Sequence, residues 1–270
     1  MGIITLKANM KNPFRYMDAY TSPQTVAPRF PSLCFYPWYM RLIFRYRRDV
    51  RRGAAGTGYF PARSLDVIRR IEHCGGRFVV TGLNYLRERS GPAVFVSNHM
   101  STLETMVLPG FIHLFMPVTF VVKESLVKGP FFGPIMRSRD PVVVTRRNAR
   151  ADLISVLRDG KQKLKNGISI VLFPQGTRSR AFDSRQFNTL GVKLARSAGV
   201  PLIPLALKTD FWGNGLLIRP LGKLHPQRTI FMAFASPLDS TLESARMHEQ
   251  TLFHIRSHLR DWGLPPTRIR

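Results

Sequence analysis

His99 and Glu104 are the residues of this sequence whose types and spacing point most directly to chemistry. An imidazole titrates near neutral pH, so His99 could take a proton from a hydroxyl group. A carboxylate on the far ring nitrogen would fix the tautomer and stabilise the imidazolium that forms. Glu104 lies about 500° around an ideal helix from His99, so the two cannot share one helical face. They can meet only if His99 precedes a helix and Glu104 lies in its first turn.

The residues around His99 predict the turn that this contact needs. Residues 93–96 form an apolar run rich in β-branched and aromatic side chains, which predicts a buried strand. Residues 105–108 predict a helix. His99 would therefore lie at a strand-to-helix turn, where functional groups gather in open α/β sheets.

The same stretch also has a purely structural interpretation. Ser101 and Glu104 have the spacing of a capping box, in which a serine begins a helix and the glutamate bonds back to the serine amide. His99 would then be an ordinary loop histidine. The two interpretations are compatible, because a cap that fixes the start of the helix also fixes Glu104 relative to His99.

A second group of candidate residues follows the apolar run 168–173, which predicts another buried strand. Pro174 and Gly176 predict a tight turn at the carboxyl end of that strand. The exposed amides of the turn and Arg178 would face an anion, since a guanidinium grips phosphate oxygens with two parallel hydrogen bonds. A single turn with an arginine is weak evidence, so its meaning depends on the rest of the chain.

Strand and helix patterns alternate along the chain, which predicts an α/β fold with a mainly parallel central sheet flanked by helices. The strand at 118–122 would deliver Lys123, and the strand at 142–144 ends two residues before Arg146. The predicted strands are 78–80, 93–96, 118–122, 142–144 and 168–173, and the predicted helices include 152–165 and 242–262.

An amphipathic helix is predicted over residues 30–52, ahead of this pattern. Its arginines form a basic stripe at three- and four-residue steps, and aromatic and aliphatic side chains lie opposite. Such a helix fits a membrane interface, with rings at headgroup depth and arginines on lipid phosphates. The alternative is a helix that packs on the core and exposes its arginines; the Trp and Tyr content favours the membrane. The stripe is Arg41, Arg45, Arg48 and Arg52, and Tyr39, Ile43, Tyr46 and Val50 lie opposite.

The charge balance indicates anionic partners. The 270 residues carry 41 Lys+Arg against 16 Asp+Glu, a formal charge of +25. Phosphorylated substrates, anionic lipid, nucleic acid or an acidic carrier protein would fit. Cys34 and Cys74 form no disulfide framework, which favours a reducing compartment. We find neither an uninterrupted apolar stretch of about 18 residues nor a signal-peptide pattern.

Together the segments resemble the lysophosphatidic acid acyltransferase family of glycerolipid synthesis, in order and spacing from about residue 78 to 236. The family's first motif, N-H-x-S-x-x-D, is similar to residues 98–104, with Glu104 in place of Asp. Its second motif, apolar residues ending in Arg, resembles 142–146. Its third, F-P-E-G-T-R-S, resembles 173–179 at six of seven positions, and V-P-x-x-P-V resembles 200–205.

The resemblance implies an O-acyltransferase and assigns its residues. His99 would deprotonate the hydroxyl of 1-acyl-glycerol-3-phosphate, which attacks the thioester of acyl-CoA or acyl-carrier protein and yields phosphatidic acid. Glu104 would orient His99. The thioester is already activated, so we expect no metal and no further cofactor. The residues implied in binding the acceptor are Lys123, Arg146, Gln175, Gly176, Thr177 and Arg178.

The resemblance also implies an organisation and a location. Residues 59–265 would form the acyltransferase domain, after a poorly ordered segment 1–29 and the helix and linker 30–58, with a tail at 266–270. The enzyme would sit peripherally or monotopically on the cytoplasmic face of a membrane, next to an anionic lipid surface.

Three departures from the family pattern bear on the substrate. Glu104 adds a methylene, Asp140 stands where the second motif begins with Gly, and Gln175 removes a charge from the third motif. Gln175 motivates an alternative acceptor such as lyso-ornithine lipid. A nucleic-acid or lipid-binding protein is another alternative, but it rests on charge alone, without zinc-finger spacing or an RNA-binding signature, so we expect no nucleic-acid partner. His254 and His258 share a helix face but lack a third metal ligand.

Overall fold

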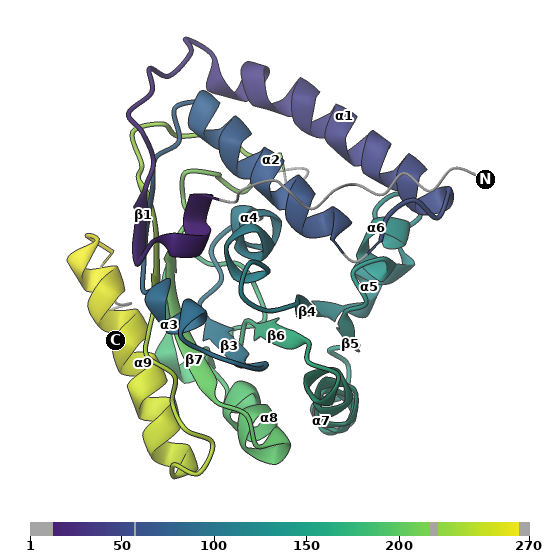
Figure 1. The fold of residues 1–270 in the computed structure, drawn as a ribbon, viewed down its shortest axis with the longest axis vertical. Helices are drawn as coiled ribbons and strands as arrows, with labels where there is room; N and C mark the ends of the chain where they lie inside the picture. The colour runs from purple at the N-terminus through teal and green to yellow at the C-terminus, as the bar shows by residue number, and fades with distance from the viewer. Residues whose placement is uncertain (1–12, 57, 216–220, 265–270) are drawn as a thin grey trace.

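A computed structural model describes residues 13–56, 58–215 and 221–264. Its centre is an eight-stranded sheet in the order β1-β2-β8-β7-β3-β6-β4-β5 (Figure 1). The strands are β1 Ala19–Thr21, β2 Phe78–Thr81, β3 Val94–Ser97, β4 Val118–Lys123, β5 Val142–Val144, β6 Ser169–Leu172, β7 Leu202–Lys208 and β8 Ile230–Phe234.

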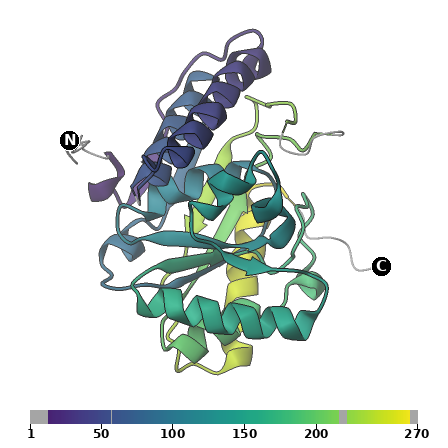
Figure 2. The ribbon, with the colours of Figure 1, turned by 90° about the vertical axis from the view of Figure 1, so that its right-hand side faces the viewer.

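Helices cover both faces of the sheet. The first layer holds α1, α2 and α4, and the opposite layer holds α7, α8 and α9, as the two views show (Figure 1, Figure 2). The helices are α1 Pro31–Arg51, α2 Tyr59–His73, α3 Asn84–Arg87, α4 Leu103–Ile112, α5 Glu124–Lys128, α6 Gly133–Arg137, α7 Ala149–Lys165, α8 Leu190–Ala198 and α9 Ser244–Asp261. Short 3-10 helices lie at Pro13–Tyr16 and Ser184–Gln186.

The sheet is mixed. Five of the seven strand pairings are parallel, whereas β1 pairs antiparallel with β2 and β7 pairs antiparallel with β8. Every residue of β3 and β6 is buried, because both strands lie inside the sheet with helices above and below. The α/β prediction is confirmed, and the expected mainly parallel sheet carries two antiparallel pairings.

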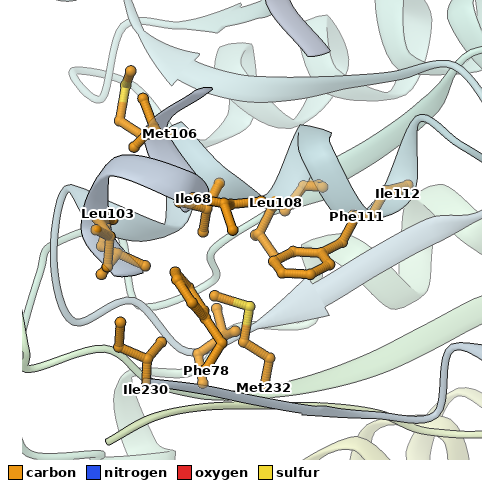
Figure 3. Packing of buried hydrophobic residues seen from close by; sticks show 14 of the residues in the cluster. Ile68, Phe78, Leu103, Met106, Leu108, Phe111, Ile112, Ile230 and Met232 are labelled. Atoms are coloured by element: carbon orange, nitrogen blue, oxygen red, sulfur yellow. The ribbon is translucent and has the colours of Figure 1, made fainter. Parts of the chain in front are cut away.

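Two apolar clusters hold the layers to the sheet. In the first, Leu108 and Phe111 of α4 and Ile68 of α2 gather with Phe78 and Met232 of the sheet (Figure 3). The second lies under α7, α8 and α9. Burial of this kind stabilises by about 25 cal/mol per Å² of apolar surface, so both faces contribute to placing the loops at the strand ends.

The N-terminal segment is more ordered than its composition indicates. The prediction of poor order for residues 1–29 is wrong for residues 14–22, although residues 1–12 and the predicted tail 266–270 lie outside the described ranges. Phe14 is buried and its ring packs on Phe111, with 4.7 Å between centroids. The hydroxyls of Tyr20 and Ser22 both donate to Glu72 at 2.5 Å. These contacts depend on α2 and α4, so local composition does not reveal them.

Helix α1 forms where predicted, but its ring-rich face packs inward. Tyr39, Ile43 and Tyr46 are each no more than 2% exposed, and the Tyr39 ring meets Trp212 edge-on at 5.2 Å. The prediction that this face enters a membrane is therefore wrong: it has a protein partner. The outer face exposes Leu33 and Phe44. It also carries Arg41, Arg45 and Arg48. Among the described helices, none is both long and apolar enough to span a bilayer.

Candidate active site

The turn between β3 and α4 is fixed by contacts from neighbouring strands. The Asn98 side chain bonds both backbone groups of Leu207: its Nδ2 donates to the carbonyl at 2.7 Å, and its Oδ1 accepts from the amide at 2.9 Å. It thereby ties the residue that follows β3 to β7, beyond the last paired residues Ser97 and Leu205. The carbonyl of His99 accepts a hydrogen bond from the amide of Ser179 at 2.8 Å. His99 is thus held from the β6 side and the β7 side.

Glu104 is fully buried and lies next to His99, as predicted. Its Oε2 pairs with His99 Nδ1. Its Oε1 accepts hydrogen bonds from the amides of Met100 and Ser101, at 2.8 and 3.0 Å, and from the Thr209 hydroxyl at 2.5 Å. Because α4 begins at Leu103, His99 precedes the helix and Glu104 stands in its first turn.

The capping interpretation holds only in part, because the N-cap residue of α4 is Thr102, which makes no side-chain cap hydrogen bond. The bond from the Ser101 amide to Glu104 is the return half of a capping box. The Ser101 hydroxyl instead accepts from the Leu103 amide at 3.2 Å and donates to Thr209. The Glu104 carboxylate therefore bonds the turn before α4 and also orients His99. The orientation of the imidazole ring thus depends on the position of α4.

The imidazole of His99 is held flat against an aromatic ring. It stacks on Phe173, with 4.2 Å between centroids and 15° between planes. Its side chain is 12% exposed. With Nδ1 committed to Glu104, Nε2 is the nitrogen left to exchange a proton with a substrate.

The predicted tight turn follows β6 and reaches His99. Gly176 has a φ of +72°, in the region that favours glycine, and its amide donates to the Phe173 carbonyl at 3.0 Å. Gln175 Oε1 accepts from the His99 amide at 3.3 Å. Thr177 is exposed at the same turn.

Arg146 joins this turn from β5. Its Nη1 donates to the Gly176 carbonyl. Its backbone has a φ of +58°, and its amide donates to Asp152 Oδ2 at 2.6 Å, which anchors this unusual conformation. Burial lowers the pKa of the Arg146 guanidinium. In the register of β4 and β5 Lys123 stands opposite Val144, so Lys123 and Arg146 lie at the same edge of the sheet.

Arg178 follows in the same turn and is partly buried. Burial raises the pKa of the Tyr39 hydroxyl to about 12, and the charges of the Arg139 and Arg178 guanidinium groups oppose that rise. Asp140, which replaces the family's glycine, has a φ of +46°, a conformation that glycine adopts more readily, and pairs with Lys163 at 2.6 Å.

Thr209 is the site residue that sequence reasoning missed. Its hydroxyl donates to Glu104 across a separation of 105 residues. A lone threonine after an apolar strand carries no local signal, and only the pairing of β7 with β3 brings it to the site. Phe173 and Asn98 lie inside recognised motifs, but their contacts with the ring and the strand were not foreseen either.

The sequence is similar to those of known acyltransferases. Residues 77–208 match the family model described as Acyltransferase. The chain is 36% identical over 132 residues to a 1-acyl-sn-glycerol-3-phosphate acyltransferase from Pseudomonas aeruginosa, covering 49% of each protein. It is 32% identical over 173 residues to the protein of that name from Escherichia coli, covering 63% of this chain and 66% of the relative. The matches thus span less than two thirds of these relatives.

The same fold occurs in a solved structure. The crystal structure of the 1-acyl-sn-glycerophosphate (LPA) acyltransferase PlsC from Thermotoga maritima superposes with a TM-score of 0.60, over 89% of this chain and 96% of that one. The two sequences are 20% identical, so this likeness establishes the fold alone.

Proposed function

We propose that this chain is an O-acyltransferase of the lysophosphatidic acid acyltransferase family and that it makes phosphatidic acid. It transfers an acyl group from acyl-CoA or acyl-carrier protein to the free hydroxyl of 1-acyl-glycerol-3-phosphate. The observation that carries the proposal is the pair formed by His99 and Glu104 beside the turn after β6.

The proposed reaction needs a base and a held substrate. His99 Nε2 takes the proton of the acceptor hydroxyl while its oxygen attacks the thioester carbonyl. The carbon–sulfur bond breaks, and the departing thiolate takes the proton from the imidazolium. Glu104 keeps the ring in the tautomer that leaves Nε2 unprotonated and stabilises the imidazolium. Holding both substrates beside the ring supplies much of the rate, because the thioester is already activated.

Arg146, Arg178 and Lys123 are the proposed ligands of the acceptor's phosphate. Arg146 is anchored to the turn at Gly176, close to the His99 loop. The acceptor's hydroxyl and phosphate are separated by a short glycerol backbone, so a phosphate site near the base fits this substrate. The Gln175 side chain is neutral, and its oxygen accepts a hydrogen bond from the His99 amide. Because the family's third motif has a charged Glu at this position, lyso-ornithine lipid remains the alternative acceptor.

The proposed location is the cytoplasmic surface of a membrane, bound peripherally through the outer face of α1. Leu33 and Phe44 are exposed there, and the Phe44 ring meets Phe131 at 5.2 Å, next to the exposed Phe132. The arginine stripe lies on the same outer face and would meet anionic headgroups, each charge contributing about 1 kcal/mol. The proposed membrane contact thus combines shallow insertion of apolar side chains with electrostatic attraction between the arginines and anionic lipid headgroups.

A lysolipid panel tests the proposal. The purified full chain is incubated with acyl-CoA or acyl-carrier protein and with lysophosphatidic acid, lyso-ornithine lipid or other lysophospholipids, and products are identified by mass spectrometry. Phosphatidic acid is expected, and His99→Ala should abolish it. The matched control is His73→Ala, at an exposed histidine of α2. Product from lyso-ornithine lipid alone would favour that lipid as the acceptor. The absence of product with every acceptor would refute the proposal.

A further inference from the structure

Three cationic side chains surround one buried carboxylate near the active site. Asp210 is 5% exposed. Arg180 Nη2 lies 3.3 Å and Arg228 Nε 3.6 Å from its Oδ2, and Lys208 Nζ lies 3.5 Å from its Oδ1. Arg228 Nη1 also donates to the Asp210 carbonyl at 3.2 Å. We call Arg180, Lys208 and Arg228 with Asp210 the β7 cation cluster.

The chain connects this cluster directly to the catalytic turn. Asp210 follows Thr209, whose hydroxyl donates to Glu104. Arg180 follows Ser179, whose amide donates to the His99 carbonyl. The cluster therefore lies within one residue of two groups that hold the pair of base and carboxylate.

Lys208 and Asp210 of the cluster lie on the other side of His99 from Arg146 and Lys123. In the sheet, β7 flanks β3 on one side, whereas β6, β4 and β5 follow on the other. Lys208 and Asp210 belong to the β7 end. Arg146 and Lys123 belong to the β5 and β4 ends. A base between two cationic groups fits a reaction in which two anionic substrates meet.

The cluster carries more positive charge than its carboxylate balances. Within the described residues, the ion pairs of all three cations go to the single Asp210. Burial, followed by the charges of Arg228 and Lys223, lowers the pKa of the neighbouring His225, which reflects the same positive surroundings. One carboxylate and three cations leave an excess of two positive charges, which favours a bound anion.

We propose that the β7 cation cluster binds a phosphate group of the acyl donor. The inference rests on the proposed function: acyl-CoA and acyl-carrier protein both hold their thioester on a phosphopantetheine arm, which contains a phosphate. Asp210 is buried and pairs with all three cations, whereas the Arg180 side chain is 59% exposed and so can reach a bound anion. Arginine is suited to this role because its planar fork matches phosphate oxygens.

The test compares a double variant of the cluster with a control variant at an arginine outside it. The double variant Arg180→Gln/Arg228→Gln removes two charges from the cluster. The matched control, Arg185→Gln, breaks a similar arginine–aspartate pair in the following loop, where Arg185 lies 3.1 Å from Asp183. Steady-state kinetics are measured with acyl-CoA, acyl-carrier protein, acyl-phosphopantetheine and a phosphate-free acyl thioester of N-acetylcysteamine.

The double variant should raise KM for phosphate-bearing donors at least about tenfold, the cost of one lost charge-assisted bond. KM for lysophosphatidic acid and for the N-acetylcysteamine thioester should not change, and Arg185→Gln should resemble the wild type. A rise with all three phosphate donors assigns the cluster to the phosphopantetheine phosphate. A rise with acyl-CoA alone assigns it to the nucleotide phosphates of that donor.

Several results would overturn the inference. These are an equal rise with the phosphate-free donor, a rise confined to the acceptor, an equal fall of kcat with every donor, or no change. A loss of binding to anionic phosphatidylglycerol vesicles with unchanged donor KM would assign the cluster to lipid headgroups instead. Calorimetric titration of coenzyme A onto the same proteins separates a failure of this inference from a failure of the proposed function. Weaker binding to the double variant supports the donor site even if no acceptor is acylated.

Discussion

Replacing Glu104 by Gln tests whether the carboxylate acts on His99 or only caps α4. The contacts divide between its two oxygens: Oε1 accepts from two amides and the Thr209 hydroxyl, and Oε2 pairs with His99 Nδ1. The amide oxygen of Gln can occupy the first position and retain those three donors. Its NH2 group would then face Nδ1.

This exchange should reverse the tautomer of His99. An NH2 group can only donate, so Nδ1 must accept and the ring proton moves to Nε2, where it blocks the uptake of a proton from the substrate. We expect kcat to fall by about 10³–10⁴, which is about 4–5.5 kcal/mol of activation free energy. The free energy of unfolding should fall by less than about 3 kcal/mol, since one charge-assisted bond is lost and three bonds are kept.

Initial rates and urea unfolding curves measure the two effects separately. The control Thr209→Val removes one hydrogen bond to Oε1 and leaves the pair with Nδ1, so its rate should fall by no more than about tenfold. If Glu104→Gln keeps more than about a tenth of the wild-type rate with unchanged stability, Glu104 is only a cap and the reasoning fails.

Three further predictions follow from the contacts. Asn98→Ala should cost about 2–4 kcal/mol in urea unfolding, because both buried backbone groups of Leu207 lose their partners. Arg146→Ala should raise KM for the acceptor about 10–100-fold; an equal rise for the donor would contradict a phosphate-binding role. Burial lowers the pKa of His254 to about 4 from 6.5, so the unfolded chain binds more protons and stability is lost as pH falls from 6.5 to 4. The slope should reach about 1.4 kcal/mol per pH unit, and His254→Gln should flatten it in unfolding curves at pH 7, 6 and 5.

The parts of the site that sequence could reveal are local. His99 and Glu104 lie within one strand–turn–helix unit, so their spacing and the expected start of the helix allowed the sequence to predict that they could meet. Gly176 predicted a turn because glycine adopts a positive φ more readily than other residues, and its φ in the structure is positive. Thr209 and Asp210 could not be found this way, since they reach the site only through the order of β7 and β3 in the sheet.

The N-terminal helix shows a different limit. Periodicity correctly separated an apolar face from a basic one, but it does not show which neighbour the apolar face has. Lipid and protein interiors are equally apolar, and the ring that covers Tyr39 belongs to Trp212, far along the chain. The strand β1 was missed because its three residues, Ala19–Thr21, are too few to show an alternating pattern.

The central position of β3 also determines when the active site can appear during synthesis. Val96 pairs with Leu172 on one side and Pro204 on the other, so both neighbours of the catalytic strand leave the ribosome long after it. Contacts between distant segments form slowly, and the apolar side chains of β3 remain uncovered until β7 has been made. Substitutions in β6 and β7 should therefore affect the yield of folded enzyme from a nascent chain, even where the mature protein works normally.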